Sequence, residues 1–109
     1  MKSKDAIIIN KILKYINELY DFIDGFDYDK FCMDKKTINA CVFNLSQIGE
    51  LVGKVSNEYK KKILGIEWRG LKSLRNRIVH DYDGINLSMI WGFLENELID
   101  LENQLKSIL

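Results

Sequence analysis

The chain has 109 residues, and its 16 lysine and arginine side chains balance 16 aspartate and glutamate side chains, so its formal net charge is zero. This length suits one domain with a modest core. The 47% hydrophobic content is ordinary for a soluble globular protein. There is no proline, the strongest helix breaker, which favours long helices. We therefore expect a single domain over residues 1–109.

The N-terminal sequence and the cysteines indicate a cytoplasmic protein. Asn10 and Lys11 end the first apolar run too early for a secretory signal or a membrane span. Cys32 and Cys41 are not spaced like a metal site. Without a signal peptide, reduced thiols packed in the fold are favoured over a disulfide. We expect a cytoplasmic location and no membrane contact.

The first half of the chain predicts two helices, because apolar residues recur at steps of three and four. Gly25 suits the position just after the first helix. The stretch Phe26–Met33 is predicted as a loop, and Asp34 as the N-cap of the second helix. The predicted core stripes are Ile9, Ile12, Leu13, Ile16, Leu19, Tyr20 and Ile23, then Ile38, Cys41, Val42, Leu45, Ile48, Val52 and Val55.

The second half predicts two more helices after a lysine-rich connection at 56–65 with room for one helical turn. The third begins near 66–68 and weakens at 80–84, and Asn86 is the predicted N-cap of the fourth. Their stripes are Trp68, Leu71, Leu74 and Ile78, then Ile90, Trp91, Leu94, Leu98, Leu101, Leu105 and Ile108.

No period-two strand pattern is found, so the expected fold is all-α, an antiparallel up-and-down four-helix bundle. Surplus apolar residues off the main seams are compatible with a homodimer. They are Ile7, Ile8, Phe43, Leu51, Met89 and Phe93.

A basic segment lies beside the only histidine of the chain. Residues 54–77 hold eight basic and two acidic side chains, a net charge of +6 that would attract nucleic acid. For Lys60–Lys62 alone, a solvated helix face is favoured. The segment contains Arg75, and His80 and Tyr82 follow it. Histidine takes and gives protons near neutral pH and arginine fits phosphate, so the pair indicates phosphodiester chemistry.

The spacing of Arg75 and His80 does not suit one ideal helix. Five residues apart, they would point roughly 140° apart. They can share a phosphate if the helix ends or widens after Ile78, or if a second copy contributes its own motif. RNA cleavage without a metal needs a base, an acid and a cation. One histidine does not easily fill both proton roles, so a composite site on a two-fold axis is favoured. Tyr82 shares a helix face with Arg75 if the helix persists.

Other candidate groups have two interpretations each. A lone histidine with two distant cysteines lacks the ligands of a catalytic zinc. Asp81 and Asp83 could hold magnesium, but they fit helix-end and turn roles equally well. Trp68 and Trp91 could stack on bases, but both lie on apolar stripes, which favours core packing. Glu50 could orient the arginine of the motif or be exposed.

The sequence W-x2-L-x2-L-R-N-x-I-V-H-D-Y at Trp68–Tyr82 resembles the signature of the HepT-like toxins of the HEPN superfamily. The similarity extends to Asp34–Glu50 and Gly84–Trp91 and covers most of the chain. Two departures bear only on local loop and cap geometry. Glu67 stands where members often have proline, and Asn86 stands where aspartate is common.

The resemblance implies a dimeric helical bundle that acts as a ribonuclease with neither a metal nor a cofactor. It places Arg75 and His80 at the dimer cleft as catalytic residues, with Asn76 in support. It implies that a cognate MntA-like nucleotidyltransferase antitoxin modifies Tyr82 with AMP. The added phosphate and bulk would repel RNA and block the cleft.

Three basic side chains near the motif are further candidate RNA contacts: Arg69, Lys72 and Arg77. One alternative function is a non-catalytic HEPN domain that binds RNA or nucleotide, or that regulates a nucleotidyltransferase. Another is a plain helical dimer scaffold.

Overall fold

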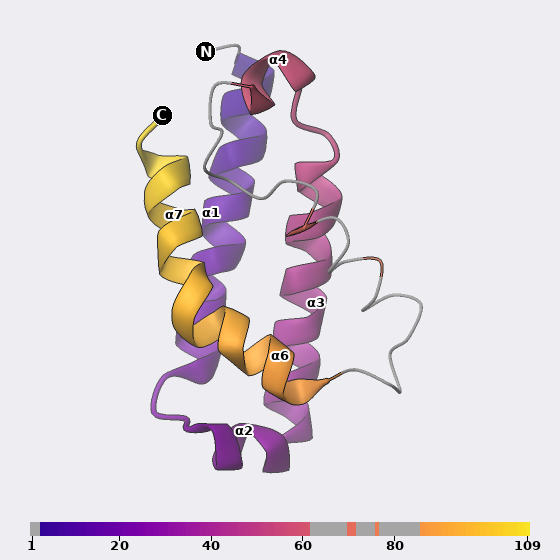
Figure 1. Ribbon diagram of the computed structural model, residues 1–109, viewed down its shortest axis with the longest axis vertical. Helices are drawn as coiled ribbons and strands as arrows, with labels where there is room; N and C mark the ends of the chain where they lie inside the picture. The colour runs from indigo at the N-terminus through magenta and orange to yellow at the C-terminus, as the bar shows by residue number, and fades with distance from the viewer. Residues whose placement is uncertain (1–2, 62–69, 72–75, 77–85) are drawn as a thin grey trace.

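The computed structural model describes residues 3–61, 70–71, 76 and 86–109, and the regular structure within these ranges is helical (Figure 1). The predicted all-α helical bundle is confirmed. Of the predicted third helix, only Gly70, Leu71 and Asn76 are described, each in helical conformation. The elements are α1 (Ser3–Ile23), α2 (Tyr28–Met33), α3 (Lys35–Val52), α4 (Asn57–Lys60), α6 (Leu87–Gly92), the π-helical turn η2 (Phe93–Glu97) and α7 (Leu98–Lys106).

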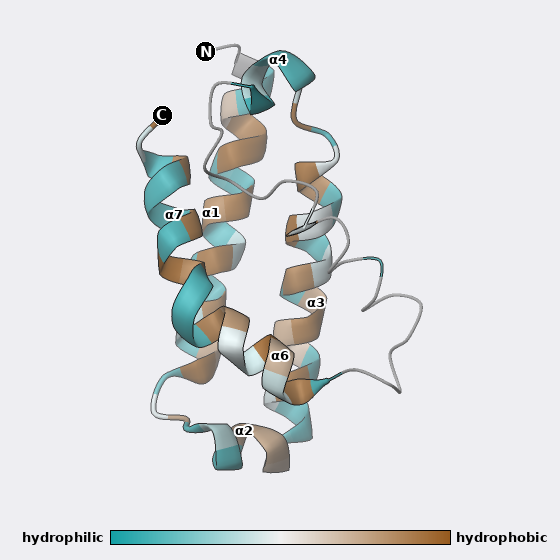
Figure 2. Ribbon diagram, viewed as in Figure 1, coloured by the Kyte–Doolittle hydropathy of each residue, from teal (hydrophilic) through white to brown (hydrophobic). Residues whose placement is uncertain are grey.

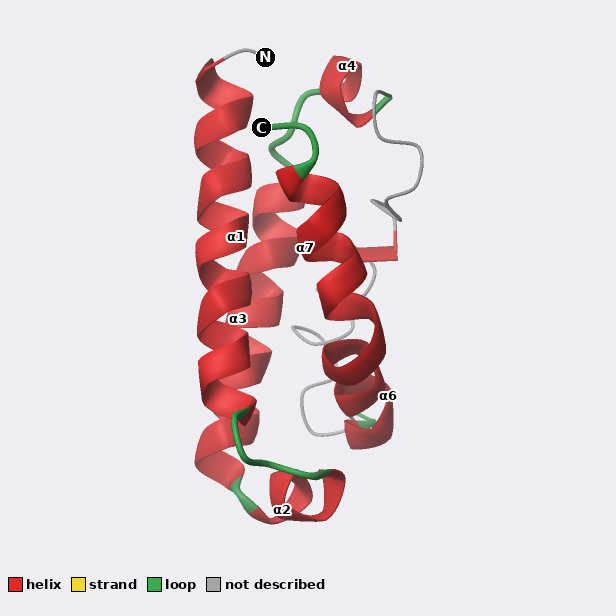
Figure 3. Ribbon diagram, turned by 90° about the vertical axis from the view of Figure 1, so that its left-hand side faces the viewer, coloured by secondary structure: helices red, strands yellow, loops and turns green. Residues whose placement is uncertain are grey.

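The helices form two layers around one core. Figure 3 shows α1 and α3 in one layer, α6 and α7 in the other, and α2 at one end. The chain runs in opposite directions along α1 and α3 (Figure 1). Hydrophobic and hydrophilic residues alternate along each long helix, as amphipathic helices require (Figure 2). The fully buried core side chains include Ile9, Ile12, Ile16, Leu19, Cys41, Ile48, Val52, Ile90, Leu98 and Leu105.

A short helix, α2, stands where a loop was predicted. Gly25 ends α1 as predicted, with φ +78°, a conformation that glycine adopts at the lowest cost. Asp27 then accepts a 2.8 Å hydrogen bond from the backbone N–H of Lys30 and so caps α2. Phe31 has no exposed surface and packs α2 against the core. The loop prediction was wrong because six residues are too few to show a helical apolar repeat.

The caps of α3 and α4 are side chains. Asp34 accepts from the backbone N–H of Thr37 at 3.2 Å, as predicted for the start of α3. The expected single turn in the lysine-rich connection is α4, where Ser56 Oγ accepts from the backbone N–H of Tyr59. The buried Asp5 carboxylate accepts from Ser56 N–H at 3.1 Å and from Ser56 Oγ at 2.8 Å. The start of α1 therefore positions the start of α4.

The predicted fourth helix is present, but a π-helical turn interrupts it. Asn86 caps it as predicted, accepting from two backbone N–H groups of the first turn at 3.0 and 3.3 Å. Ile90, Leu94 and Leu98 follow at four-residue steps, each of which overshoots an ideal helical turn by about 40°. The wider turn of η2 absorbs this excess, and all three side chains are buried.

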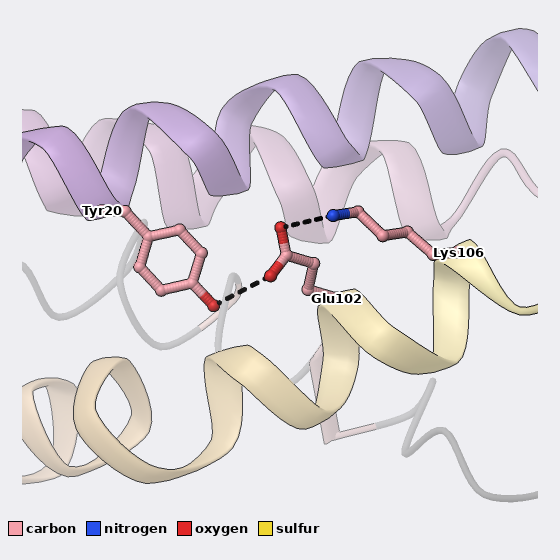
Figure 4. Close-up of polar contacts among 3 residues, drawn as sticks. All are labelled: Tyr20, Glu102 and Lys106. Atoms are coloured by element: carbon pink, nitrogen blue, oxygen red, sulfur yellow. Dashed lines mark hydrogen bonds and ion pairs between the residues drawn. The ribbon is translucent and has the colours of Figure 1, made fainter.

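Two polar contacts hold α1 against its neighbours. Tyr20 Oη donates to Glu102 Oε1 at 3.3 Å, and Lys106 Nζ lies 3.3 Å from Glu102 Oε2 (Figure 4). Burial, together with the Glu102 charge and hydrogen bond, raises the pKa of Tyr20 to about 12. The buried Asn44 of α3 donates to Tyr15 O at 3.2 Å and to the Glu18 carboxylate of α1 at 2.9 Å.

The surplus apolar residues do not form one group. Ile7 and Phe43 are each 57% exposed, as expected for residues that lie outside the core stripes. Ile8 is buried, and Leu51 and Phe93 are partly buried against the core, so the expectation was wrong for these three. The reason for Ile8 is that α1 contacts both α3 and α7 and buries a wider sector than its main stripe.

Candidate functional site

The candidate catalytic segment lies between α4 and α6. Asn76 is helical and exposed. The other predicted site residues lie outside the described part of the chain, so their convergence and the loosened helix end stay predictions. They are Arg69, Lys72, Arg75, Arg77, His80 and Tyr82.

The chain enters this segment from an anchored turn. Tyr59 of α4 is buried, and its hydroxyl donates to the backbone carbonyl of Ile108 at 3.5 Å. Burial is the main cause that raises the pKa of Tyr59, and the charge of Asp5 adds to it. Hydrogen bonds to Asp5, near the beginning of the described chain, and to Ile108, near its end, therefore hold α4 in place where the chain continues into the candidate catalytic segment.

Basic and acidic candidates near the entry are mostly solvated. Lys54 and Lys61 are exposed and Lys60 is partly exposed, which fits the solvated helix face favoured for Lys60–Lys62. Glu50 is also exposed, while its predicted partner in the motif lies outside the described residues.

The chain leaves the segment into α6, where Trp91 packs against α2. The rings of Trp91 and Phe31 have centroids 5.1 Å apart and are tilted by 39°. Trp91 Nε1 donates to Glu95 Oε2 at 3.0 Å. Trp91 is only partly buried, so core packing is confirmed and some of the indole remains accessible. Trp68, the other stacking candidate, is not described.

A pocket of about 470 Å³ lies where α2 meets α6 and η2. Tyr28, Trp91, Gly92 and Glu95 contribute to its lining. The sequence reasoning missed this pocket because it treated the α2 segment as a loop. The neighbouring Phe26, Asp27 and Tyr28 were the available signal, but nothing in the sequence placed them beside α6.

A second pocket, of about 510 Å³, lies between α1 and α3 near the start of α1. Three lysines surround an apolar lining, and no carboxylate is among the described residues that line it. Its residues are Lys4, Ile7, Ile8, Lys11, Leu51 and Lys54.

No metal centre is found among the described residues, and Cys41 is a buried thiol. Within residues 3–61, 70–71, 76 and 86–109, no group of three or more His, Cys, Asp or Glu side chains could hold a metal ion. Metal independence is still a prediction, since His80 lies outside these ranges. Both cysteines are free, and burial raises the pKa of Cys41 to about 12, which keeps it a protonated thiol. No helix in the same ranges is long and apolar enough to cross a membrane.

Comparison with known proteins gives the class first: the relatives along this chain are named as ribonucleases. A family model described as "Ribonuclease HepT-like" matches residues 12–108. The chain belongs to the HepT-like ribonuclease family.

Three relatives illustrate the likeness. The chain is 31% identical to a "Putative RNase" of Methanocaldococcus jannaschii, over 99% of this chain and 93% of that one. It is 30% identical to a "Putative RNase" of Caldanaerobacter subterraneus subsp. tengcongensis, over 93% and 90%. It is 24% identical to a "Probable ribonuclease HepT" of Thermococcus cleftensis, over 99% and 98%. No solved structure matches the chain.

Proposed function

We propose that the protein is the ribonuclease toxin of a toxin–antitoxin system and cuts RNA without a metal ion. The family match over residues 12–108 carries this proposal, because it encloses the R-x4-H pair of Arg75 and His80. In the proposed reaction the ribose 2′-oxygen bonds to phosphorus while the bond to the 5′-oxygen breaks. A base takes the 2′-hydroxyl proton, and an acid gives one to the leaving oxygen.

The two residues have complementary roles in this reaction. His80 moves protons, and the Arg75 guanidinium stabilises the charge that develops on the phosphoryl oxygens. Asn76 supports the site. Because a single histidine does not easily act as acid and base at once, we place the reaction at a cleft between two copies, where two His80 side chains meet.

Replacing His80 by alanine tests the proposal. We expect His80→Ala to slow RNA cleavage by at least about 100-fold, the usual contribution of a general acid–base group. The measurement is cleavage of a labelled RNA by purified protein, with circular dichroism to show that the helices are intact. Lys36→Ala, an exposed position on α3, is the matched control and should cleave normally. Cleavage by His80→Ala at the wild-type rate would contradict the proposed role.

We further propose that a cognate nucleotidyltransferase antitoxin silences the protein by transferring AMP from ATP to Tyr82. The tyrosine oxygen bonds to the α-phosphorus, pyrophosphate leaves, and the phenolic proton passes to a base. The negative phosphate would then repel RNA from the cleft.

Mass spectrometry tests this modification directly. After incubation with ATP and the cognate enzyme, the peptide that contains Tyr82 should carry AMP and cleavage should fall. Tyr82→Phe should remain unmodified and active. AMP found only on other peptides would remove Tyr82 from the proposal.

A second candidate function follows from the single histidine, which is sparse provision for acid–base chemistry. In it, the protein binds RNA or nucleotide, or regulates a nucleotidyltransferase, without cutting RNA. Salt-sensitive RNA binding by wild-type protein with no cleavage would favour this function.

A further inference from the structure

The pocket between α2 and α6 combines an aromatic surface with hydrogen-bond acceptors. Its volume of about 470 Å³ is in the range of small-molecule sites. Figure 1 shows α2 below α6, at the end of the molecule away from α4. We propose that this pocket accepts one unpaired base of the RNA substrate and selects a base that carries an exocyclic amino group. The inference rests on the proposed ribonuclease function and adds a specificity site to it.

The aromatic side chains are accessible and held in place. Tyr28 is 38% exposed and lines the pocket together with Ser88 of α6. Trp91 rests on the buried Phe31, and its indole N–H is fixed by Glu95. Aromatic rings of this kind stack on any unpaired base, because every base has a π-face.

Gly92 is the observation that points to a ligand. It has helical dihedrals, φ −58° and ψ −41°, so its backbone does not require glycine. A Cβ built at Gly92 would meet no atom within 4 Å, so packing does not require glycine either. Glycine inside a helix lowers stability relative to alanine. Since Gly92 lines the pocket, a methyl group there would narrow the space that a base needs.

The polar groups of the pocket favour a base over a phosphate. Asp27 Oδ1 accepts from Lys30 N–H and Glu95 Oε2 accepts from the indole, which leaves Asp27 Oδ2 and Glu95 Oε1 available in the described contacts. Carboxylates accept hydrogen bonds from the exocyclic amines of bases. They also repel phosphate, so the RNA backbone has to lie elsewhere. Adenine, cytosine and guanine carry such an amine, and uracil does not.

The pocket also follows the catalytic motif directly in the chain. Its Ser88 stands eight positions after His80, on the first helix beyond the motif.

The test compares two glycine variants in the full-length protein, made in the His80→Ala background so that RNA stays intact. Gly92→Ala should weaken binding of a short oligoadenylate by about five-fold or more, the smallest usual effect of losing one stacked base. Its melting temperature should be equal or higher, which separates a blocked pocket from a damaged fold. Gly53→Ala is the matched control. Gly53 also has helical dihedrals, but it ends α3 at the far end of the molecule, and it should bind like the parent.

Fluorescence anisotropy with oligoadenylate, oligocytidylate and oligouridylate gives the readout. The parent should bind the uridylate most weakly, and Glu95→Gln should reduce that preference. Equal binding by Gly92→Ala and the parent, or a preference for uridylate, would overturn the inference. The inference would also be overturned if an arginine-rich peptide bound in the pocket and Gly92→Ala left RNA binding unchanged. These outcomes leave the cleavage result for His80→Ala untouched, so the two proposals fail independently.

Discussion

At the scale of single residues, the hydroxyl proton of Tyr20 contributes to stability. Its pKa of about 12 lies above the ordinary 10 because the site is partly buried and faces the Glu102 carboxylate. The folded state therefore holds this proton more tightly than the unfolded state. The resulting stability is fully present below pH 10 and is lost as the pH rises from 10 through 12.

We expect Tyr20→Phe to lower the free energy of unfolding by about 0.5–1 kcal/mol at pH 8, the usual net value of a partly exposed hydrogen bond. The difference from wild type should shrink between pH 10 and 12, as ionisation of Tyr20 removes the same donor. Urea unfolding at a series of pH values measures it. Glu102→Gln should move the decline to lower pH. A difference that stays constant up to pH 12 would refute the role assigned to Tyr20.

Residues whose role is local were predictable, and those whose role is set by packing were not. Gly25, Asp34 and Asn86 act within a few residues of their position, and all three predictions are confirmed. Asn44 was missed, because its partners lie on another helix, 26 and 29 positions away. Asp5 was missed for the same reason.

At the scale of helices, Gly25 and Gly92 show opposite uses of glycine. Gly25 has φ +78°, where any side chain is strained, whereas Gly92 has ordinary helical dihedrals. We expect Gly25→Ala to lower the free energy of unfolding by about 1–2 kcal/mol, the cost of a left-handed conformation for a residue with a Cβ. Chemical denaturation with circular dichroism measures it. An unchanged denaturation midpoint would show that α1 can end without glycine.

The long helices were predictable because their apolar repeats extend over several turns. α1 and α3 bury most of the predicted stripes; Leu13, Tyr20, Ile23 and Ile38 are partly buried, and the buried Val55 lies just beyond α3. α2 was not predictable, since its single buried anchor gives no repeat. The π turn was not predicted either, because the four-residue steps from Ile90 to Leu98 also occur in uninterrupted α-helices such as α1.

At the scale of the whole molecule, the all-α architecture followed from the stripes, but the meeting of distant segments did not. The α2–α6 pocket joins residues about sixty positions apart, and no pattern in the chain pairs them. The candidate catalytic pair was recognised from its residue types and from a family signature. The geometry of the pair stays a prediction, because Arg75 and His80 lie outside the described residues.

The position of α7 has a consequence for synthesis of the protein. α7 packs on α1, with Tyr20 meeting Glu102 across 82 positions of sequence. A ribosome makes α1 and α3 before α7, so the part of α1 that α7 covers stays exposed until α7 has left the exit tunnel. The complete bundle cannot form while residues 98–106 are still being made. An RNA-cutting enzyme that folds this way completes its bundle only after the codons for residues 98–106 have been read.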